Sequence, residues 1–297
     1  MTFEESQKYI YSLMNLPRRE YMKNSLECEV YLKRLKFFLN IIGNPEKKIP
    51  NYIHVGGTSG KGSVVNFLHK IFEVSGIRAA SYISPHSNSI TERFRVGKKE
   101  ISEKEFVKLV EKIKPALEKY VRTSPYDMLS FFELNVAMAL LYFVEKEVKW
   151  AILEVGCGGK YDGTNIIPHA KIVVITNIEK DHTYILGNTK EKIAYKKIGI
   201  VKKGSHVFTN EKNTKILKIL KRESKILKAS SFTEVESENF SAQLNCIGAH
   251  QKQNAAIAAA AAKKAGIKNK NILKGLKQTK QPLRIEMISK KPIIILD

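Results

Sequence analysis

The chain has 297 residues, of which 43% are hydrophobic and 27% are charged, a balance that supports a packed core and excludes wholesale disorder. The net charge is +22, but the basic residues are scattered and mostly lysine, so we interpret them as a generic basic surface rather than a nucleic-acid-binding site. The three cysteines lack metal-ligand spacing, the first residues do not resemble a secretory signal, and no apolar run is long enough to span a membrane. We therefore expect a cytoplasmic protein with neither a nucleic acid nor a membrane as its partner.

The predicted elements alternate between helices and strands along the chain. Helical periodicity covers residues 2–14 and 27–42, and a strand at 52–55, a helix at 62–76 and a strand ending near Ile83 then form a βαβ unit. Further helices are predicted near 103–121, 130–147, 188–199, 212–222 and 250–265, and further strands at 150–155, 171–176 and 292–296. Apolar strands that alternate with helices indicate an α/β fold with a mostly parallel sheet flanked by helices.

The strongest single motif lies between the first predicted strand and the helix after it. It consists of Gly57, Thr58, Ser59, Gly60, Lys61, Gly62 and Ser63. Glycines let backbone N–H groups turn toward phosphate oxygens, and a helix N-terminus adds favourable partial charge. In such a loop the lysine can pair with the β- and γ-phosphates, and the final serine hydroxyl can bind Mg²⁺. The alternative is a glycine-rich turn with an exposed lysine, which the coincidence of strand, turn and helix disfavours.

Several segments in a fixed order resemble one known family. The loop resembles the G-T-x-G-K-G-[ST] loop of folylpolyglutamate synthases in the Mur ligase superfamily. Other segments resemble the family's S-P-H…T/N-E-R, E-V-G-x-G-G-R-x-D-A-T-N, D-H-x-x-x-L-G, H-Q-x-x-N-A and P-G-R-x-E motifs; they begin at Ser84, Glu154, Asp181, His250 and Leu283. Because these motifs keep their order across nearly the whole chain, the sequence is identified as a member of the folylpolyglutamate synthase/dihydrofolate synthase family.

The resemblance implies a domain organisation. Residues 1–282 would form the ATP-binding domain, which resembles the phosphate-loop NTPase-like central domain of Mur ligases. Residues 283–297 would form a linker and the first strand of a C-terminal glutamate-binding domain. Because the sequence stops at Asp297, where a predicted strand ends, we interpret it as truncated before that domain.

The resemblance also implies an activity. The family adds L-glutamate to tetrahydrofolate, to dihydropteroate or to both, through an acyl phosphate made from ATP, so the expected ligands are ATP, two Mg²⁺ ions, L-glutamate and a folate or dihydropteroate. We expect a monomer. Because domain closure supplies positioning and excludes water, we predict that this chain binds Mg-ATP but ligates poorly or not at all. Two alternatives stay open, namely a non-catalytic ATP-binding remnant and a Mur-superfamily ligase with another substrate.

By the same resemblance, one Mg²⁺ would lie between Ser63, Glu154 and the ATP phosphates, and a second would use Ser84, Glu154 and His182. Lys197 aligns with a family lysine that is carbamylated and helps to hold the second metal, although a solvated helix lysine is the alternative interpretation in so lysine-rich a chain. The predicted catalytic residues are Lys61, Glu154, His182 and Lys197.

The remaining predicted contacts belong to the nucleotide and the pterin. Asn254, Arg284 and Asp297 would contact the nucleotide, and the planar donor fork of an arginine suits phosphate oxygens. Asn254 has the alternative interpretation of a polar residue at the start of a helix. The predicted pterin contacts are Ser130, Phe131, Phe132 and Glu133, which resemble a T-x-F-E stretch, together with Tyr161, Asp162 and Gly163. An aromatic pair at the start of a helix is more often part of the core.

Overall fold

The computed structural model describes residues 1–13, 27–238 and 240–296. The helices are α1 (Phe3–Ser12), α2 (Glu29–Ile41), α3 (Lys61–Val74), α4 (Glu103–Thr123), α5 (Phe131–Glu145), α6 (Thr183–Leu186), α7 (Lys190–Ile198), α8 (Thr214–Ile226), α9 (Ala249–Lys264) and α10 (Asn269–Gln278), with 3₁₀ turns η3 (Pro45–Lys47), η4 (Ile90–Arg93) and η5 (Gly163–Ile166). The strands are β1 (Tyr52–Gly56), β2 (Ala79–Tyr82), β3 (Phe94–Val96), β4 (Lys99–Glu100), β5 (Trp150–Glu154), β6 (Ile172–Ile175), β7 (His206–Thr209), β8 (Ser231–Glu234), β9 (Glu286–Lys290) and β10 (Ile293–Leu296). No helix in these ranges is long and apolar enough to cross a membrane.

The main sheet has eight strands in the order β4-β3-β2-β5-β1-β6-β7-β8. The six strands from β2 to β8 in that order pair in parallel, and only β3 and β4 at one edge pair antiparallel. Every residue of β1, β2, β5 and β6 is buried, as is usual for parallel strands covered on both faces. The predicted α/β class with a mostly parallel sheet is confirmed.

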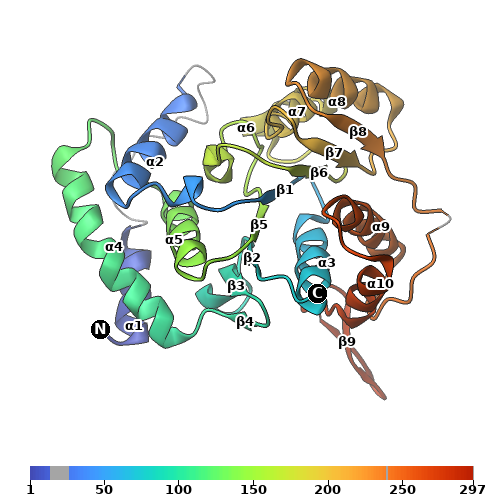
Figure 1. Ribbon diagram of the computed structural model, residues 1–297, viewed down its shortest axis with the longest axis horizontal. Helices are drawn as coiled ribbons and strands as arrows, with labels where there is room; N and C mark the ends of the chain where they lie inside the picture. The colour runs from blue at the N-terminus through green and yellow to red at the C-terminus, as the bar shows by residue number, and fades with distance from the viewer. Residues whose placement is uncertain (14–26, 239, 297) are drawn as a thin grey trace.

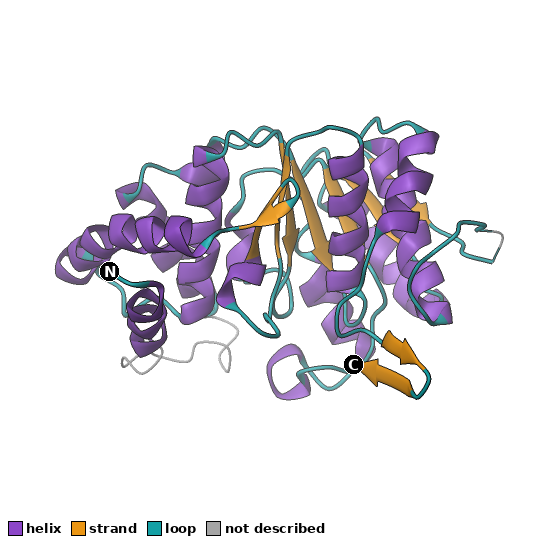
Figure 2. Ribbon diagram, turned by 90° about the horizontal axis from the view of Figure 1, so that it is seen from below, coloured by secondary structure: helices purple, strands orange, loops and turns teal. Residues whose placement is uncertain are grey.

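Helices cover both faces of this sheet (Figures 1 and 2). On one face α3 packs against α9 and α10, and its core includes Ile53 and Val55 of β1. On the other face α2, α4, α5, α7 and α8 cover a second core, which includes Tyr52 of β1. Alternate residues of a strand point to opposite faces, so a single strand contributes to both cores.

The sheet order decides which strand ends surround the phosphate loop. Strand β1 leads into that loop, and its neighbours in the sheet are β5 and β6. The register pairs Val55 with Glu154 and Gly56 with Ile175. Because these strands are parallel, their carboxyl ends meet at one edge, which is where open α/β sheets bind ligands.

Strands β9 and β10 form an antiparallel hairpin outside the main sheet, as Figure 2 shows. Its apolar side chains are partly exposed, with Ile293 71% exposed and Ile288 54% exposed. Within the described chain these two strands pair only with each other. The domain division predicted at residue 282 stays a prediction.

Candidate nucleotide-binding and active site

The phosphate loop is held in shape by the end of β6. Gly57 has φ +136°, a left-handed conformation, and a Cβ at this position would collide with the hydroxyl of Thr176. The backbone N–H of Thr58 donates to the carbonyl of Asn177 at 2.8 Å, and the N–H of Ser59 donates to Asn177 Oδ1 at 2.9 Å. A glycine at 57 is therefore required, and the loop is fixed before any ligand binds.

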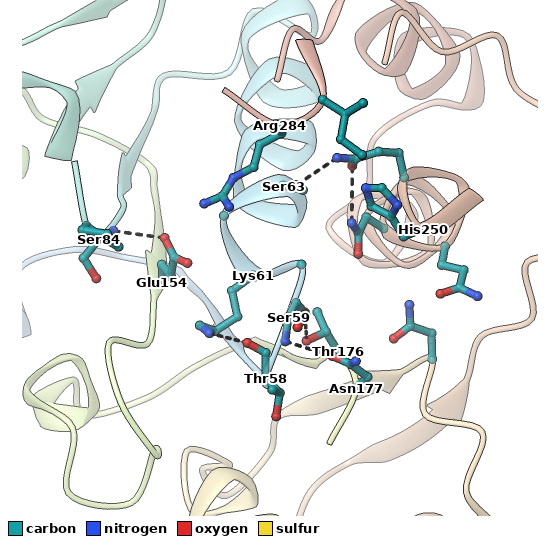
Figure 3. A pocket seen from close by; sticks show the side chains of 18 residues that line it. Thr58, Ser59, Lys61, Ser63, Ser84, Glu154, Thr176, Asn177, His250 and Arg284 are labelled. Carbon is teal, nitrogen blue, oxygen red and sulfur yellow. Dashed lines mark hydrogen bonds between the residues drawn. The ribbon is translucent and has the colours of Figure 1, made fainter. Parts of the chain in front are cut away.

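A cavity of about 520 Å³ opens above this loop. Its wall includes Thr58 to Ser63, Ser84, Pro85, Glu154, Thr176, Asn177, Asn210, His250, Gln251, Gln253, Asn254, Arg284 and Ile285. Figure 3 shows side chains from several strand ends and from the first turn of α9 around the start of α3. The cavity thus combines a helix N-terminus with basic side chains, an arrangement that favours a phosphate group.

Glu154 is a buried carboxylate at the end of β5. It is 6% exposed, and its Oε2 accepts a hydrogen bond from the backbone N–H of Ser84 at 3.0 Å. Burial raises the pKa of Glu154 to about 7, an effect that the nearby Lys61 opposes. Among the described residues, no lysine or arginine nitrogen lies within 4 Å of this carboxylate. A cation bound in the cavity would stabilise the ionised form of the buried Glu154 carboxylate.

Two basic side chains supply positive charge near Glu154. Lys61, the first residue of α3, donates from Nζ to the carbonyl of Thr58 at 2.9 Å. Arg284 extends from the chain that follows α10 and points into the same side of the cavity (Figure 3). The residues on both sides of Arg284 have positive φ, +53° at Leu283 and +54° at Ile285, which is uncommon for branched side chains.

Lys197 lies behind the loop rather than in the nucleotide cavity. Its side chain is almost fully buried, and Nζ donates to the carbonyl of Gly57 at 2.7 Å. Burial, reinforced by the positive charge of Lys61, lowers the pKa of Lys197 to about 8. The alternative of a solvated helix lysine does not fit this position.

A second cavity, of about 410 Å³, adjoins the first and shares Ser84 and Pro85 with it. Its other lining residues are Tyr31, Arg93, Ser130, Phe131, Phe132, Glu133, Gly156, Cys157, Tyr161, Asp162, Gly163 and His182. Phe131 stacks on Tyr11 with ring centroids 5.5 Å apart, and the Arg93 guanidinium lies 5.3 Å from the Phe131 ring centroid. The cavity therefore presents aromatic surface suited to a flat, largely apolar ligand.

The two acidic residues in this wall, Glu133 and Asp162, accept hydrogen bonds from other groups of the protein. Glu133 is 2% exposed and accepts from Arg34 Nε at 2.9 Å, and it also closes the capping box at the start of α5 with Ser130. Asp162 is buried, which raises its pKa, and it accepts from the backbone N–H groups of Cys157 and Thr164. These carboxylates hold the cavity wall in place, whereas the aromatic side chains face the cavity.

The predicted residues thus fall into three groups. The phosphate loop, Ser84, Glu154, Asn254 and Arg284 surround the first cavity, and Ser130 to Glu133, Tyr161 to Gly163 and His182 surround the second. His182 directly precedes α6 and has φ +44°, and its side chain is about half exposed. Lys197 supports the loop from behind, and Asp297 lies outside the described residues. No group of three His, Cys, Asp or Glu side chains within the described ranges could hold a metal by itself.

Sequence reasoning missed several residues of the first cavity. Thr176, Asn177 and Asn210 line it directly after β6 and β7. A polar residue at the carboxyl end of a parallel strand is a signal for a ligand site, but β7 itself was not predicted. Gln253, near the start of α9, was also missed.

The fold and the phosphate loop define a nucleotide-binding domain of the Mur ligase type, and the family model described as the Mur ligase middle domain matches residues 55–230. The chain is 33% identical to the dihydrofolate synthase/folylpolyglutamate synthase of Bacillus subtilis, over 90% of this chain and 68% of that protein. It is 29% identical to the folylpolyglutamate synthase of Lacticaseibacillus casei, over 89% of this chain and 68% of that protein.

Solved structures agree with these sequence relatives. The structure of an FPGS-AMPPCP-folate complex superposes with a TM-score of 0.87 at 28% identity, covering 100% of this chain and 76% of that chain. The folylpolyglutamate synthase of Mycobacterium tuberculosis, complexed with ADP and AMPPCP, gives a TM-score of 0.87 at 26% identity, covering 99% and 70%. The chain belongs to the folylpolyglutamate synthase/dihydrofolate synthase family of ATP-dependent ligases.

Proposed function

We propose that this protein uses ATP to attach L-glutamate to a folate, to dihydropteroate or to both. The observation that carries the proposal is the meeting of two different cavities at Ser84 and Pro85, beside the buried Glu154. One cavity has the charge and backbone of a phosphate site, and the other has aromatic walls. A relative with the same fold was solved with a nucleotide analogue and folate bound.

In this proposal the nucleotide phosphates lie on the loop from Gly57 to Ser63, at the N-terminus of α3. Lys61 and Arg284 provide the positive charge that a phosphoryl transfer needs, because negative charge spreads over the phosphoryl oxygens in the transition state. Asn254 contacts the nucleotide from α9, where its Nδ2 also donates to Gln251 at 3.3 Å. We keep Asp297 as a proposed nucleotide contact from the resemblance alone.

The residues around Glu154 fit a magnesium ion. Mg²⁺ prefers hard oxygen ligands, and Ser63, Ser84 and Glu154 offer two hydroxyls and a carboxylate. At Gly62 an added Cβ would be 3.5 Å from the Glu154 oxygens, so the glycine keeps the space beside the carboxylate open. Bound there, Mg²⁺ would neutralise charge on the phosphate oxygens.

A second Mg²⁺ is proposed near Ser84, Glu154 and His182, with a carbamylated Lys197 in support. Carbamylation requires a neutral amine, and the lowered pKa of Lys197 increases the neutral fraction near neutral pH. The buried amine donates to the Gly57 carbonyl, so a modified Lys197 would act directly behind the phosphate loop.

The reaction needs an acceptor carboxylate placed in line with the terminal phosphate. The carboxylate oxygen attacks the γ-phosphorus and ADP leaves; the glutamate amine then attacks the acyl carbon, loses a proton and releases inorganic phosphate. Stacking of the acceptor ring system against the aromatic side chains of this cavity, Phe131, Phe132 and Tyr161, would aim its carboxylate toward Ser84 and the nucleotide cavity. Holding both reactants in this way converts a bimolecular step into an effectively unimolecular one.

The test uses purified chain, Mg-ATP, L-glutamate and either dihydropteroate or tetrahydrofolate, followed by mass spectrometry. Because this chain is predicted to ligate poorly or not at all by itself, we expect at most a low yield of a product one glutamate heavier, absent in the Lys61→Met variant and unchanged in Lys70→Met. Lys70 is the matched control because it lies on the same helix and pairs with Glu73 at 2.7 Å. If chain that binds Mg-ATP forms no product from either acceptor, this chain does not catalyse the ligation.

A further inference from the structure

The segment that follows α10 has a strained backbone. Leu283 has φ +53° and Ile285 has φ +54°, so both neighbours of Arg284 lie in the left-handed region, which is costly for residues with a Cβ. The N–H of Leu283 donates to Glu286 Oε2 at 3.2 Å, which is a contact within the segment itself. A strained conformation persists only where the surrounding structure imposes it. A contact with the rest of the protein must therefore hold this segment in place.

Gln281, at the start of this segment, makes such a contact. Its side chain is 4% exposed, and Nε2 donates to the backbone carbonyl of Ser63 in the first turn of α3 at 3.1 Å. Oε1 accepts from Asn66 Nδ2 at 3.1 Å, and Asn66 Oδ1 accepts from Arg95 Nη1 at 2.9 Å. These hydrogen bonds join the segment to α3 and to β3. We call the side chains of Gln281, Asn66 and Arg95 the Gln281 clamp.

The polarity of the Gln281 clamp is fixed at both ends. A guanidinium can only donate, so the Arg95 end requires the oxygen of Asn66. A backbone carbonyl can only accept, so the Ser63 end requires the NH₂ group of Gln281. The two amides therefore meet with one donor facing one acceptor, and neither amide oxygen is left unpaired. Replacing Gln281 by an apolar residue would break the two bonds that join the segment to α3.

Arg284 lies between two cavities. It lines the nucleotide cavity and also a third cavity of about 380 Å³. The wall of the third cavity includes Asn66, Glu92, Arg95 and Glu100. Its two glutamates attract a guanidinium, so electrostatics alone does not keep Arg284 beside the phosphate loop. Two residues, Pro282 and Leu283, separate Arg284 from Gln281, and the proline ring fixes one backbone angle of this short connection.

We propose that Gln281 is a positioning residue, which holds the strained segment on α3 and thereby keeps Arg284 in the nucleotide cavity. The inference rests on the proposed ATP site, in which Arg284 meets the phosphates, and does not depend on ligation. Gln281 itself lines neither cavity. Its effect on a bound nucleotide must therefore pass through Arg284 or through the phosphate loop at Ser63, and an experiment can separate these two routes.

The test is a double-mutant cycle on the affinity for Mg-ATP, measured by calorimetry without folate or glutamate. Arg284→Met should weaken binding by about tenfold, because a charged hydrogen-bond donor to the phosphates is lost. Gln281→Leu should weaken binding by about fivefold, and adding it to Arg284→Met should cost nothing further, because no guanidinium is left to place. Gln278→Leu, an exposed glutamine at the end of α10, is the matched control and should bind like the unaltered chain.

Independent losses in the double variant would show that Gln281 acts through the phosphate loop and not through Arg284, which would overturn the proposal. An unchanged affinity in Gln281→Leu would overturn it as well. Thermal unfolding of each variant shows whether the fold is retained. Asn66→Ala removes one hydrogen bond of the Gln281 clamp and should show the same dependence on Arg284, so the cycle can be measured even if Gln281→Leu does not fold.

Hydrogen exchange without nucleotide measures the hold on the segment directly. Gln281→Leu should speed the exchange of the amides of residues 283–286, because the segment then opens more often, whereas Gln278→Leu should not. Exchange that is no faster in Gln281→Leu would contradict the clamp. An unaltered chain that does not bind Mg-ATP would contradict the proposed nucleotide site, and the exchange rates would still show whether Gln281 holds the segment.

Discussion

Replacing Glu154 by glutamine would remove a buried charge while keeping the size of the side chain. The pKa of Glu154 rises from the ordinary 4.5 to about 7 because of burial, so the folded protein holds the proton more tightly than the unfolded chain does. The stability from this protonation is complete below about pH 4.5 and is lost as the pH rises through about 7. At about 1.4 kcal/mol per pKa unit, the raised pKa of Glu154 makes the folded state less stable than a neutral side chain would, by about 3 kcal/mol at pH 8 and about 1 kcal/mol at pH 5.

We therefore expect Glu154→Gln to be more stable than the unaltered chain in the absence of metal, by about 3 kcal/mol at pH 8 and about 1 kcal/mol at pH 5. The glutamine carbonyl can still accept from the Ser84 N–H, so the hydrogen bond observed at 3.0 Å is preserved. Urea unfolding at the two pH values, with a chelator present, measures both differences. A stability gain that does not grow between pH 5 and pH 8 would refute the reasoning. The same variant should gain no ATP affinity from added Mg²⁺.

Two further predictions concern residues that hold the two cavities in shape. Gly57→Ala should destabilise the protein by about 3 kcal/mol or more, because its Cβ would collide with Thr176, whereas Gly76→Ala, with φ +72° and open space, should lose only about 1–2 kcal/mol in the same urea unfolding measurement. Equal losses at the two glycines would contradict the collision. Arg34→Met should lose about 3–5 kcal/mol, because it leaves the Glu133 carboxylate buried without its partner. Adding Glu133→Leu should recover much of that loss in thermal unfolding, and a double variant no more stable than the single one would show that the buried charge is not the cause.

Local sequence patterns predicted the elements that carry the phosphate site. The strand at 52–55, the glycine-rich turn and the helix at 62–76 appear as β1, the phosphate loop and α3. The helices predicted at 103–121 and 130–147 appear as α4 and α5 within about two residues at each end, and both begin with a capping box. These features are specified by neighbouring residues, through hydrophobic periodicity and caps.

Several short or polar secondary-structure elements were not predicted from the sequence. Strands β7 and β8 have four residues each, and β8 contributes no fully buried residue, so neither produces a clear apolar run. Helix α10 has ten residues with Gly275 in its interior, which weakens the helical signal. Gly275 packs against Ile71 of α3, where an added Cβ would come within 2.6 Å of the Ile71 backbone. Close packing between helices explains that glycine, and such a contact is invisible in the sequence.

The sequence by itself determined the phosphate loop, the α/β class and the family, because each depends on consecutive residues or on motifs in a fixed order. The tertiary structure decided which of the remaining polar groups meet. It buried Lys197 behind Gly57, paired Glu133 with Arg34 and set Asn210 in the wall of the nucleotide cavity. Each of these outcomes depends on the strand order and on helices packed across the sheet, and pairing between distant segments is fixed by the shape of the whole core rather than by local preference.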